Sequence, residues 1–254
     1  TWLDTHGYPT PDVDEVEVDV TYSTIRIDRP PSDRRVLLVA PEADRPRGAA
    51  LLPVEGDQWE VIFQGVHDET APTTREDFLE WAEAYPVDEV GRLVREREWT
   101  QGIARYPFPS SIRRHYETLD RFPEGLLVTG DAIASFNPIY GQGMSVAALD
   151  ALVLHHELDD GLDGLGSRFF NRTSDIVDDV WKLAVGNDFI FSETTGPKPT
   201  GTDLFNRYVA RLIRRAHDDA ALTEAFLRVF RLEKPVTSLL HPGVVWRVFR
   251  LRAG

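Results

Sequence analysis

The first part of the chain shows the two-residue alternation of half-buried strands. Apolar and polar residues alternate over 16–22, which is the period of a strand with one buried face. Two apolar runs, 36–39 and 49–54, are followed by a turn at 55–57 and a second alternating segment over 59–63. This pattern predicts an antiparallel meander.

Helical signals begin after the meander. Thr73 and Glu76 have the spacing of a capping box, so we expect a helix over 75–84 that ends before Pro86. A second, short helix is expected over 89–95.

The pattern returns to strands further on. We expect a strand over 99–106, ended by Pro107 and Pro109. A short apolar strand over 126–129 is expected to lead into Gly130, and a helix to run from Gly143 to about His156.

From residue 167 onward the sequence is mainly helical, with further helices expected after Asp203 and Asp219. One apolar face is formed by Phe169, Phe170, Ile176, Val177, Val180, Trp181 and Ala184. The predicted fold class is therefore α/β, or a mixture of α and β. We expect a sheet region with short helices over 1–110, a middle region over 111–160 and a helical region over 161–254.

The amino-acid composition excludes several kinds of catalytic and binding site. The absence of Cys excludes thiolate catalysis, cysteine-ligated metals and disulfides, and the seven His show no metal-binding spacing. A net charge of -14 disfavours binding to nucleic acid or anionic membranes.

Targeting signals are also missing. No apolar run approaches the roughly 18 residues of a membrane span, and the first residues do not resemble a signal peptide, so we expect a soluble, cytoplasmic protein. Met144 is the only Met. We therefore expect either that an initiator was removed or that the chain begins inside a longer gene product.

The string G-D-A-I-A-S-F-N-P-I-Y-G-Q-G-M, from Gly130 to Met144, carries the candidate chemistry. The carboxylate of Asp131 can accept hydrogen bonds from the hydroxyls of a sugar-like chain. Gly141 and Gly143 expose N–H groups at a helix N-terminus, where the helix dipole favours an electron-rich ligand.

This string resembles the flavin-binding signature of the aromatic-hydroxylase superfamily of FAD-dependent monooxygenases, and the likeness covers nearly the whole chain. The resemblance implies that Asp131 holds ribityl or pyrophosphate-proximal hydroxyls, with Gly130 letting the backbone come close, and that Pro138 lies beside the isoalloxazine. It also implies that the pyrimidine edge of the isoalloxazine is covered by Gly141, Gln142, Gly143 and Met144. By the same resemblance, the antiparallel sheet would face the substrate, the FAD-binding region would be partial, and the C-terminal region would be helical.

The resemblance also implies an N-terminal βαβ unit with G-x-G-x-x-G for the pyrophosphate of FAD, and this sequence has none. Gly161, Gly164 and Gly166 follow a helix and are interpreted as an interhelical loop. We therefore expect a half-site that binds FAD weakly or not at all by itself. The chain would then be a fragment, one part of a split protein with a separate partner chain, or a degenerate relative.

Other candidate residues have a structural and a functional interpretation. The basic segment 113–115 is either a solvated charge cluster or a contact for an anionic substrate or cofactor phosphate. Phe136 and Tyr140 are either core residues or neighbours of an aromatic ring. We assign Trp59, Trp99 and Trp181 to packing, and Ser110 and Ser111 lack the G-x-S-x-G elbow of an esterase.

The function implied by the resemblance is oxygen-dependent hydroxylation or epoxidation of a hydrophobic small molecule, with FAD as cofactor and NAD(P)H as reductant. No side chain is assigned as a catalytic acid or base. The alternatives are a flavin reductase or halogenase on the same scaffold, a subunit of a split flavoenzyme, and a non-catalytic remnant.

Overall fold

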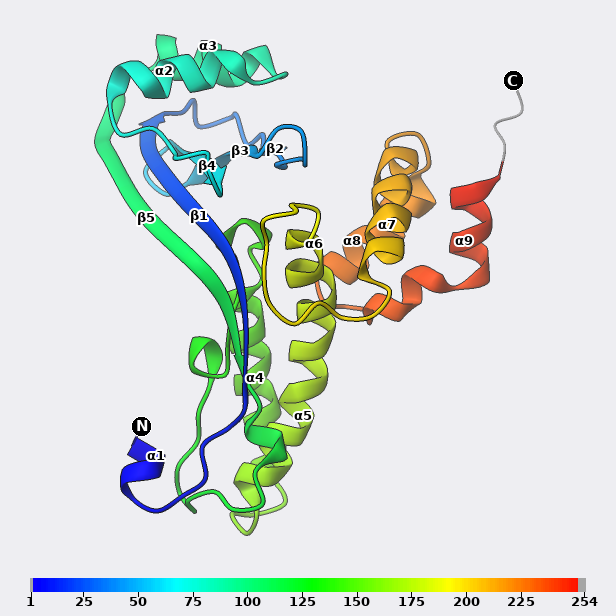
Figure 1. Cartoon of the computed structure of the whole chain (residues 1–254). Helices are drawn as coiled ribbons and strands as arrows, with labels where there is room; N and C mark the ends of the chain where they lie inside the picture. Colours follow the sequence, from blue (N-terminus) through cyan, green and yellow to red (C-terminus); the bar gives the residue numbers. More distant parts are fainter. Residues whose placement is uncertain (1, 251–254) are drawn as a thin grey trace. The chain divides into compact units, whose positions relative to one another are not determined.

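The computed structural model describes residues 2–250, which form two compact units (Figure 1). The sheet unit comprises residues 17–110 and 191–194. Of the described residues, the helical unit comprises 2–16, 111–190 and 195–250. Strands β1 and β5 each have residues in both units.

The sheet unit contains an antiparallel meander covered by two helices. Its elements are β1 (Val13–Asp28), β2 (Leu37–Val39), β3 (Arg47–Val54), β4 (Gln58–Val66), α2 (Arg75–Ala84), α3 (Asp88–Glu96) and β5 (Trp99–Arg114). The strand order is β2-β3-β4-β1-β5. Leu51 and Ile25 both pair with Val61, from either side of β4, which confirms the meander predicted from the alternation.

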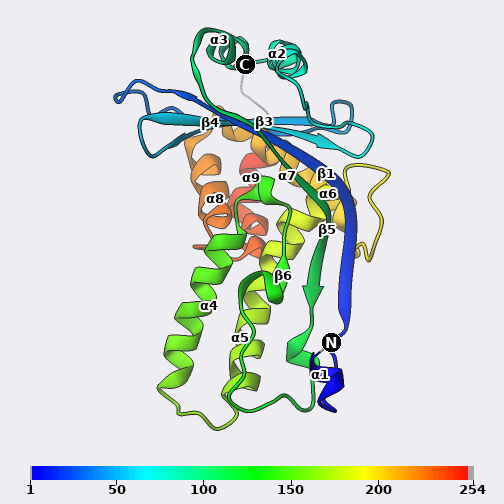
Figure 2. The same cartoon turned by 90° about the vertical axis from the view of Figure 1, so that its left-hand side faces the viewer.

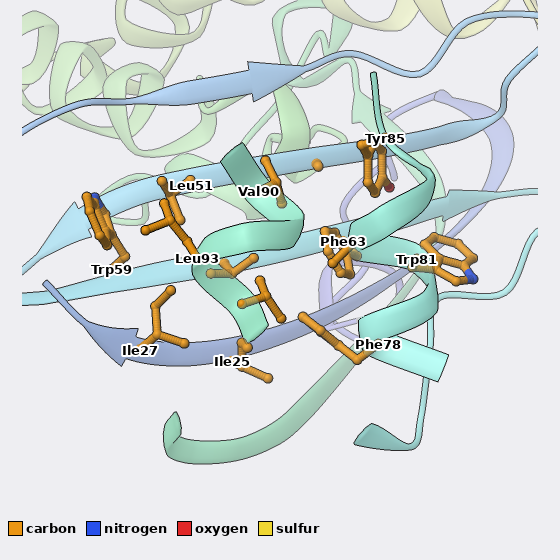
Figure 3. Close-up of a cluster of buried hydrophobic side chains, with 14 residues drawn as sticks. Ile25, Ile27, Leu51, Trp59, Phe63, Phe78, Trp81, Tyr85, Val90 and Leu93 are labelled. Carbon is orange, nitrogen blue, oxygen red and sulfur yellow. The ribbon is translucent and has the colours of Figure 1, made fainter. Parts of the chain in front are cut away.

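Helices α2 and α3 lie on one face of this sheet (Figure 2). Because side chains alternate between faces, Ile25, Val61 and Phe63 all point toward the helices and are fully buried. Phe63 contacts Phe78 of α2, with ring centroids 4.3 Å apart (Figure 3). Trp59 is also fully buried, and Trp99 packs at the edge of this core, so their assignment to packing is confirmed.

Helix α2 has the predicted bounds, but its N-cap differs from the prediction by one residue. The N-cap is Thr74, whose hydroxyl accepts a hydrogen bond from the backbone N–H of Asp77. The predicted capping box placed Thr73 at this position. Two adjacent threonines offer the same cap chemistry, and only the backbone conformation selects one of them.

The predicted end of β5 at Pro107 is wrong, because the strand continues through Pro107 and Pro109 to Arg114. In the sheet unit β5 is the edge strand beside β1. A proline is tolerated in an edge strand, where its missing N–H would otherwise face outward.

The helical unit is built on the antiparallel pair α4 (Gly143–Leu158) and α5 (Leu165–Val180), which lie side by side (Figure 1). A π-helical turn at Trp181–Val185 and α6 (Gly186–Asp188) continue α5. The remaining elements are α1 (Trp2–Thr5), η1 (Tyr116–Thr118), η2 (Gly130–Ala132), β6 (Ala134–Ser135), η3 (Pro138–Tyr140), α7 (Thr202–Ala216), α8 (Ala220–Phe230), η5 (Val236–Leu240) and α9 (Pro242–Phe249).

The core of this unit confirms the apolar face predicted after residue 167. Phe169, Val177 and Trp181 are buried together with Phe136. Helices α4, α7 and α8 also form where the sequence predicts them, whereas α9 was not predicted.

The last helices are joined through Asp219. Its carboxylate caps α8 at Ala221 and Leu222, and it also accepts hydrogen bonds from Arg247 and Arg250. These contacts join the start of α8 to α9 and the residue that follows it.

Within residues 2–250, no helix is both long and apolar enough to cross a membrane.

Candidate functional site

The glycine-rich string lies at the N-terminus of α4, entirely within the helical unit. The strand expected over 126–129 is wrong, because no strand is assigned there in the described chain. Thr129 is nevertheless extended, with φ −139° and ψ 161°. A strand needs a hydrogen-bonded neighbour, and these residues are not part of the described sheet.

Gly130 turns the chain from this extended segment into η2. Its φ of +60° lies in the left-handed region that favours glycine. Its N–H donates to the carboxylate of Asp150, at 2.9 Å. Asp150 is fully buried, two turns into α4, so this hydrogen bond fixes the turn to the helix.

Asp131 is exposed and lies beside the start of α4. A Cβ built on Gly143 would be 3.8 Å from its Oδ1, so the carboxylate is near the first N–H groups of the helix. No described residue donates a hydrogen bond to Asp131 in this structure. Its oxygens are therefore available to a ligand with hydroxyl groups.

The turn that follows is held by its own polar groups. The side chain of Asn137 accepts a hydrogen bond from the N–H of Ile139, and Pro138 occupies the first position of η3. Gly141 ends the turn with φ +65°, and a Cβ built there would meet no atom within 4 Å. The space above Gly141 is therefore open.

Gln142 differs from its neighbours because its side chain is buried. Its Nε2 donates to the carbonyl of Phe230 at 3.2 Å, whereas its Oε1 is buried without a partner in the described structure. Met144, in contrast, is 86% exposed. The structure thus brings Asp131, Gly141 and Met144 to the surface around the start of α4 and turns the Gln142 side chain inward.

Asp150 and Asp188 were not selected from the sequence. Burial raises the pKa of Asp150, and its Oδ1 has no hydrogen-bond partner within residues 2–250. A single acidic residue in the apolar stretch from Val146 to Leu154 was the available signal. Asp188 gave no such signal, because it lies 44 or more residues after the motif that it contacts.

Two residues of the basic segment 113–115, Arg113 and His115, have acidic partners within the protein. Arg113 is 7% exposed and forms ion pairs with Glu117, at 3.1 Å, and with Asp178. His115 lies between Asp14, at 3.0 Å, and Glu117, at 2.9 Å. These groups already have anionic partners, which favours the structural interpretation over contact with an anionic ligand.

The two aromatic candidates have different surroundings. Phe136 is a core residue whose ring packs against Trp181, so its structural interpretation is correct. Tyr140 is half-buried and donates its hydroxyl to Asp188 at 2.8 Å. Gly161 and Gly164 lie in the loop between α4 and α5 as predicted, and Gly166 lies in the first turn of α5.

The residues present are compatible with the flavin side of FAD. The exposed carboxylate of Asp131 suits ribityl hydroxyls. The start of α4 leaves N–H groups without intrahelical partners, and Gly141 leaves open space beside them.

No family model matches the chain. It is 28% identical over 243 residues to the protein Rv3254 of Mycobacterium tuberculosis, covering 91% of this chain and 50% of that protein. The chain thus spans about half the length of the curated relative that it matches.

Two solved structures with related folds are flavoproteins. A flavoprotein/dehydrogenase from Cytophaga hutchinsonii matches with a TM-score of 0.59 and 15% identity, over 84% of this chain and 49% of that one. CmlS, a flavin-dependent halogenase, matches with a TM-score of 0.56 and 13% identity, over 89% of this chain and 46% of that one. The chain therefore has the mixed helix and antiparallel-sheet fold found in about half of each of these flavin-dependent proteins.

Proposed function

We propose that this chain is the flavin-facing part of an FAD-dependent monooxygenase that hydroxylates or epoxidises a hydrophobic small molecule. The observation that carries the proposal is the exposed Asp131 carboxylate beside the start of α4, next to the open turn at Gly141. The fold shared with flavin-dependent proteins supports the same cofactor.

Each part of the half-site has a proposed task. Gly130 lets the backbone approach the ribityl chain and Asp131 accepts hydrogen bonds from its hydroxyls, while Pro138 borders the isoalloxazine. Gly141, Gln142, Gly143 and Met144 cover the pyrimidine edge, with the backbone N–H groups of the first turn of α4 facing it. When bound, FAD would supply the redox chemistry, with NAD(P)H as reductant and oxygen as co-substrate.

The outer face of α4 suggests where a dinucleotide-binding half would bind. We define this face as Met144, Ala148, Ala151, Leu152, His155 and Leu158, which recur at helical spacing and are all exposed. A helix that is apolar on its outer side as well as its inner side is normally covered on both. The extended Thr129 and the apolar residues before it lead into the motif that precedes this helix, and we propose that a βαβ unit binds to both features.

The substrate-side surface is proposed on the sheet unit. Leu51 and Val61 point toward α2 and α3, so the alternate residues Leu52 and Ile62 point to the opposite face. Both are partly exposed, and a half-buried apolar sheet face suits a hydrophobic molecule.

The division into regions 1–110, 111–160 and 161–254 remains part of this proposal, as does a cytoplasmic location.

Halogenation is the second candidate function, because the halogenase CmlS shares the fold with a TM-score of 0.56. Product analysis with and without oxygen or halide separates a monooxygenase, a reductase and a halogenase. A chain bearing G-x-G-x-x-G that restores tight FAD binding would identify a split enzyme.

The first test is titration of the purified chain with FAD, FMN and riboflavin, followed by flavin fluorescence. Because the half-site would contact only the flavin and ribityl groups, the three ligands should bind weakly and with similar affinity. Asp131→Ala should abolish the saturable signal, while Asp120→Ala, which removes an exposed carboxylate elsewhere in the helical unit, should leave it unchanged.

The outcomes separate the alternatives. Tight stoichiometric FAD after purification, or FAD binding far more tightly than FMN, would contradict the half-site. If none of the three flavins changes the fluorescence or the melting temperature, the chain is a non-binding remnant and the proposal fails.

A further inference from the structure

Asp188 is a buried acidic residue to which neither the sequence nor the proposed function assigns a task. It is 1% exposed and ends the helical run that begins at Leu165. This run is interrupted by the π-helical turn Trp181–Val185. An inserted residue rotates everything after it by about 100° around the helix axis, so the π turn determines the direction in which Asp188 points.

The side chain of Asp188 accepts two hydrogen bonds from the glycine-rich string. Its Oδ1 accepts from the Tyr140 hydroxyl at 2.8 Å and from Nδ2 of Asn137 at 3.2 Å. Asn187 adds a third contact by donating to the Tyr140 hydroxyl at 3.1 Å. Because Asn137 and Tyr140 flank Pro138, these bonds hold both ends of the η3 turn.

The environment of Asp188 contains few charges. Burial raises its pKa to about 7, against the opposing effect of the hydrogen bonds from Tyr140 and Asn137. Among the groups that shift this pKa, the Tyr140 phenol is the titratable one. In the π turn Lys182 is exposed and paired with Asp178, and α7 contributes the neutral Asn206, which donates to the carbonyl of Gly186.

We propose that Asp188 is a positioning residue for the flavin half-site, and that through Tyr140 and Asn137 it holds the turn that presents Pro138 and Gly141. This inference rests on the proposed function for its link to flavin. The contact between Asp188 and the turn can be tested without any ligand.

Protonation of Asp188 and order of the η3 turn are reciprocally linked. Burial favours the carboxylic acid, and it outweighs the hydrogen bonds from Tyr140 and Asn137, which favour the carboxylate. Because Asp188 binds its proton more tightly in this buried arrangement than in water, protonation must favour the arrangement to the same degree. The turn is therefore held more firmly below pH 7 than above it. Flavin affinity should fall as the pH rises over the same interval, because a preorganised turn binds with less loss of conformational freedom.

The test is hydrogen exchange of the amides of residues 139–144 in the intact, ligand-free chain at pH 6, 7 and 8, corrected for intrinsic rates. Asp188→Ala should speed their exchange about tenfold or more, the effect of losing the two hydrogen bonds from Tyr140 and Asn137, while the amides of 165–180 remain protected. Asp188→Asn retains an acceptor for Tyr140, so it should restore protection but abolish the pH dependence.

Tyr140→Phe is the second variant, because it removes the 2.8 Å bond and keeps the ring. It should also speed exchange of the turn, and Asp160→Asn, at an exposed loop position, is the matched control. The inference is overturned if neither Asp188→Ala nor Tyr140→Phe changes exchange at 139–144, or if Asp188→Asn retains the wild-type pH profile.

A flavin titration of the same proteins separates this inference from the proposed function. Wild-type flavin affinity should decrease several-fold from pH 6 to 8, and the affinity of Asp188→Asn should not. If the wild type binds no flavin but exchange of the turn depends on Asp188 as stated, the proposed function fails and the positioning contact stands.

Discussion

The stability of the helical unit should depend on pH through Asp188, and Asp188→Asn should remove that dependence. The pKa of this carboxyl rises from an ordinary value of 3.8 to about 7 because burial penalises its charged form. A raised folded-state pKa stabilises the protein below pH 3.8, and this stabilisation is lost as the pH rises toward 7.

The size of the effect follows from the two pKa values. Between pH 5 and pH 8 the carboxyl of the unfolded chain is almost fully ionised, whereas the folded chain loses its proton near pH 7. Each pKa unit corresponds to about 1.4 kcal/mol, so the wild type should lose about 2–3 kcal/mol of unfolding free energy over this interval. Asn does not titrate and should not show this loss.

Urea unfolding at pH 5, 6, 7 and 8, followed by tryptophan fluorescence, measures this difference. Trp181 lies in the same unit and is buried in its core, so it reports the relevant transition. Asp160→Asn, at an exposed position, serves as the control. The reasoning would be refuted if wild type and Asp188→Asn differed by the same free energy, within about 0.5 kcal/mol, at pH 5 and pH 8.

Three further variants test the packing and charge arguments. Phe63→Ala should destabilise the sheet unit by about 3–5 kcal/mol, because it empties a fully buried site against Phe78; a loss below about 1 kcal/mol in urea unfolding would contradict this. Arg113→Ala should destabilise the helical unit by about 3 kcal/mol by leaving Glu117 without its buried partner, whereas Arg114→Ala should have a much smaller effect in the same thermal melts. Asp219→Ala removes an N-cap and the acceptor of Arg247, so it should weaken α8 and α9 by about 1–2 kcal/mol, seen as faster amide exchange confined to those helices.

The local sequence pattern was sufficient to predict the antiparallel meander and most helices. The alternation around Trp59 and Val61 predicted β4 correctly, because one face of the strand is buried and the other is not. The spacing of Phe169, Val177 and Trp181 predicted the buried face of α5 in the same way. The π turn at Trp181–Val185 was missed, since a single inserted residue leaves the apolar pattern almost intact.

Long-range contacts were not predictable from pattern. The continuation of β5 through Pro107 depends on its position at the sheet edge, which is a property of the assembled sheet. The failure of 126–129 to form a strand depends equally on whether a neighbouring strand is present. Both errors concern hydrogen-bond partners that are distant in the sequence.

In the candidate site, too, the sequence predicted the local backbone, whereas the tertiary structure decided the contacts between distant residues. The string from Gly130 to Met144 determined by itself that a glycine-rich turn leads into a helix N-terminus, because its glycines and proline restrict the local backbone directly. Tertiary structure alone decided that Asp131 is exposed, that the Gln142 side chain is buried and that Asp188 reaches Tyr140. Burial and hydrogen bonding between distant segments depend on how the helices pack, and no local pattern encodes those contacts.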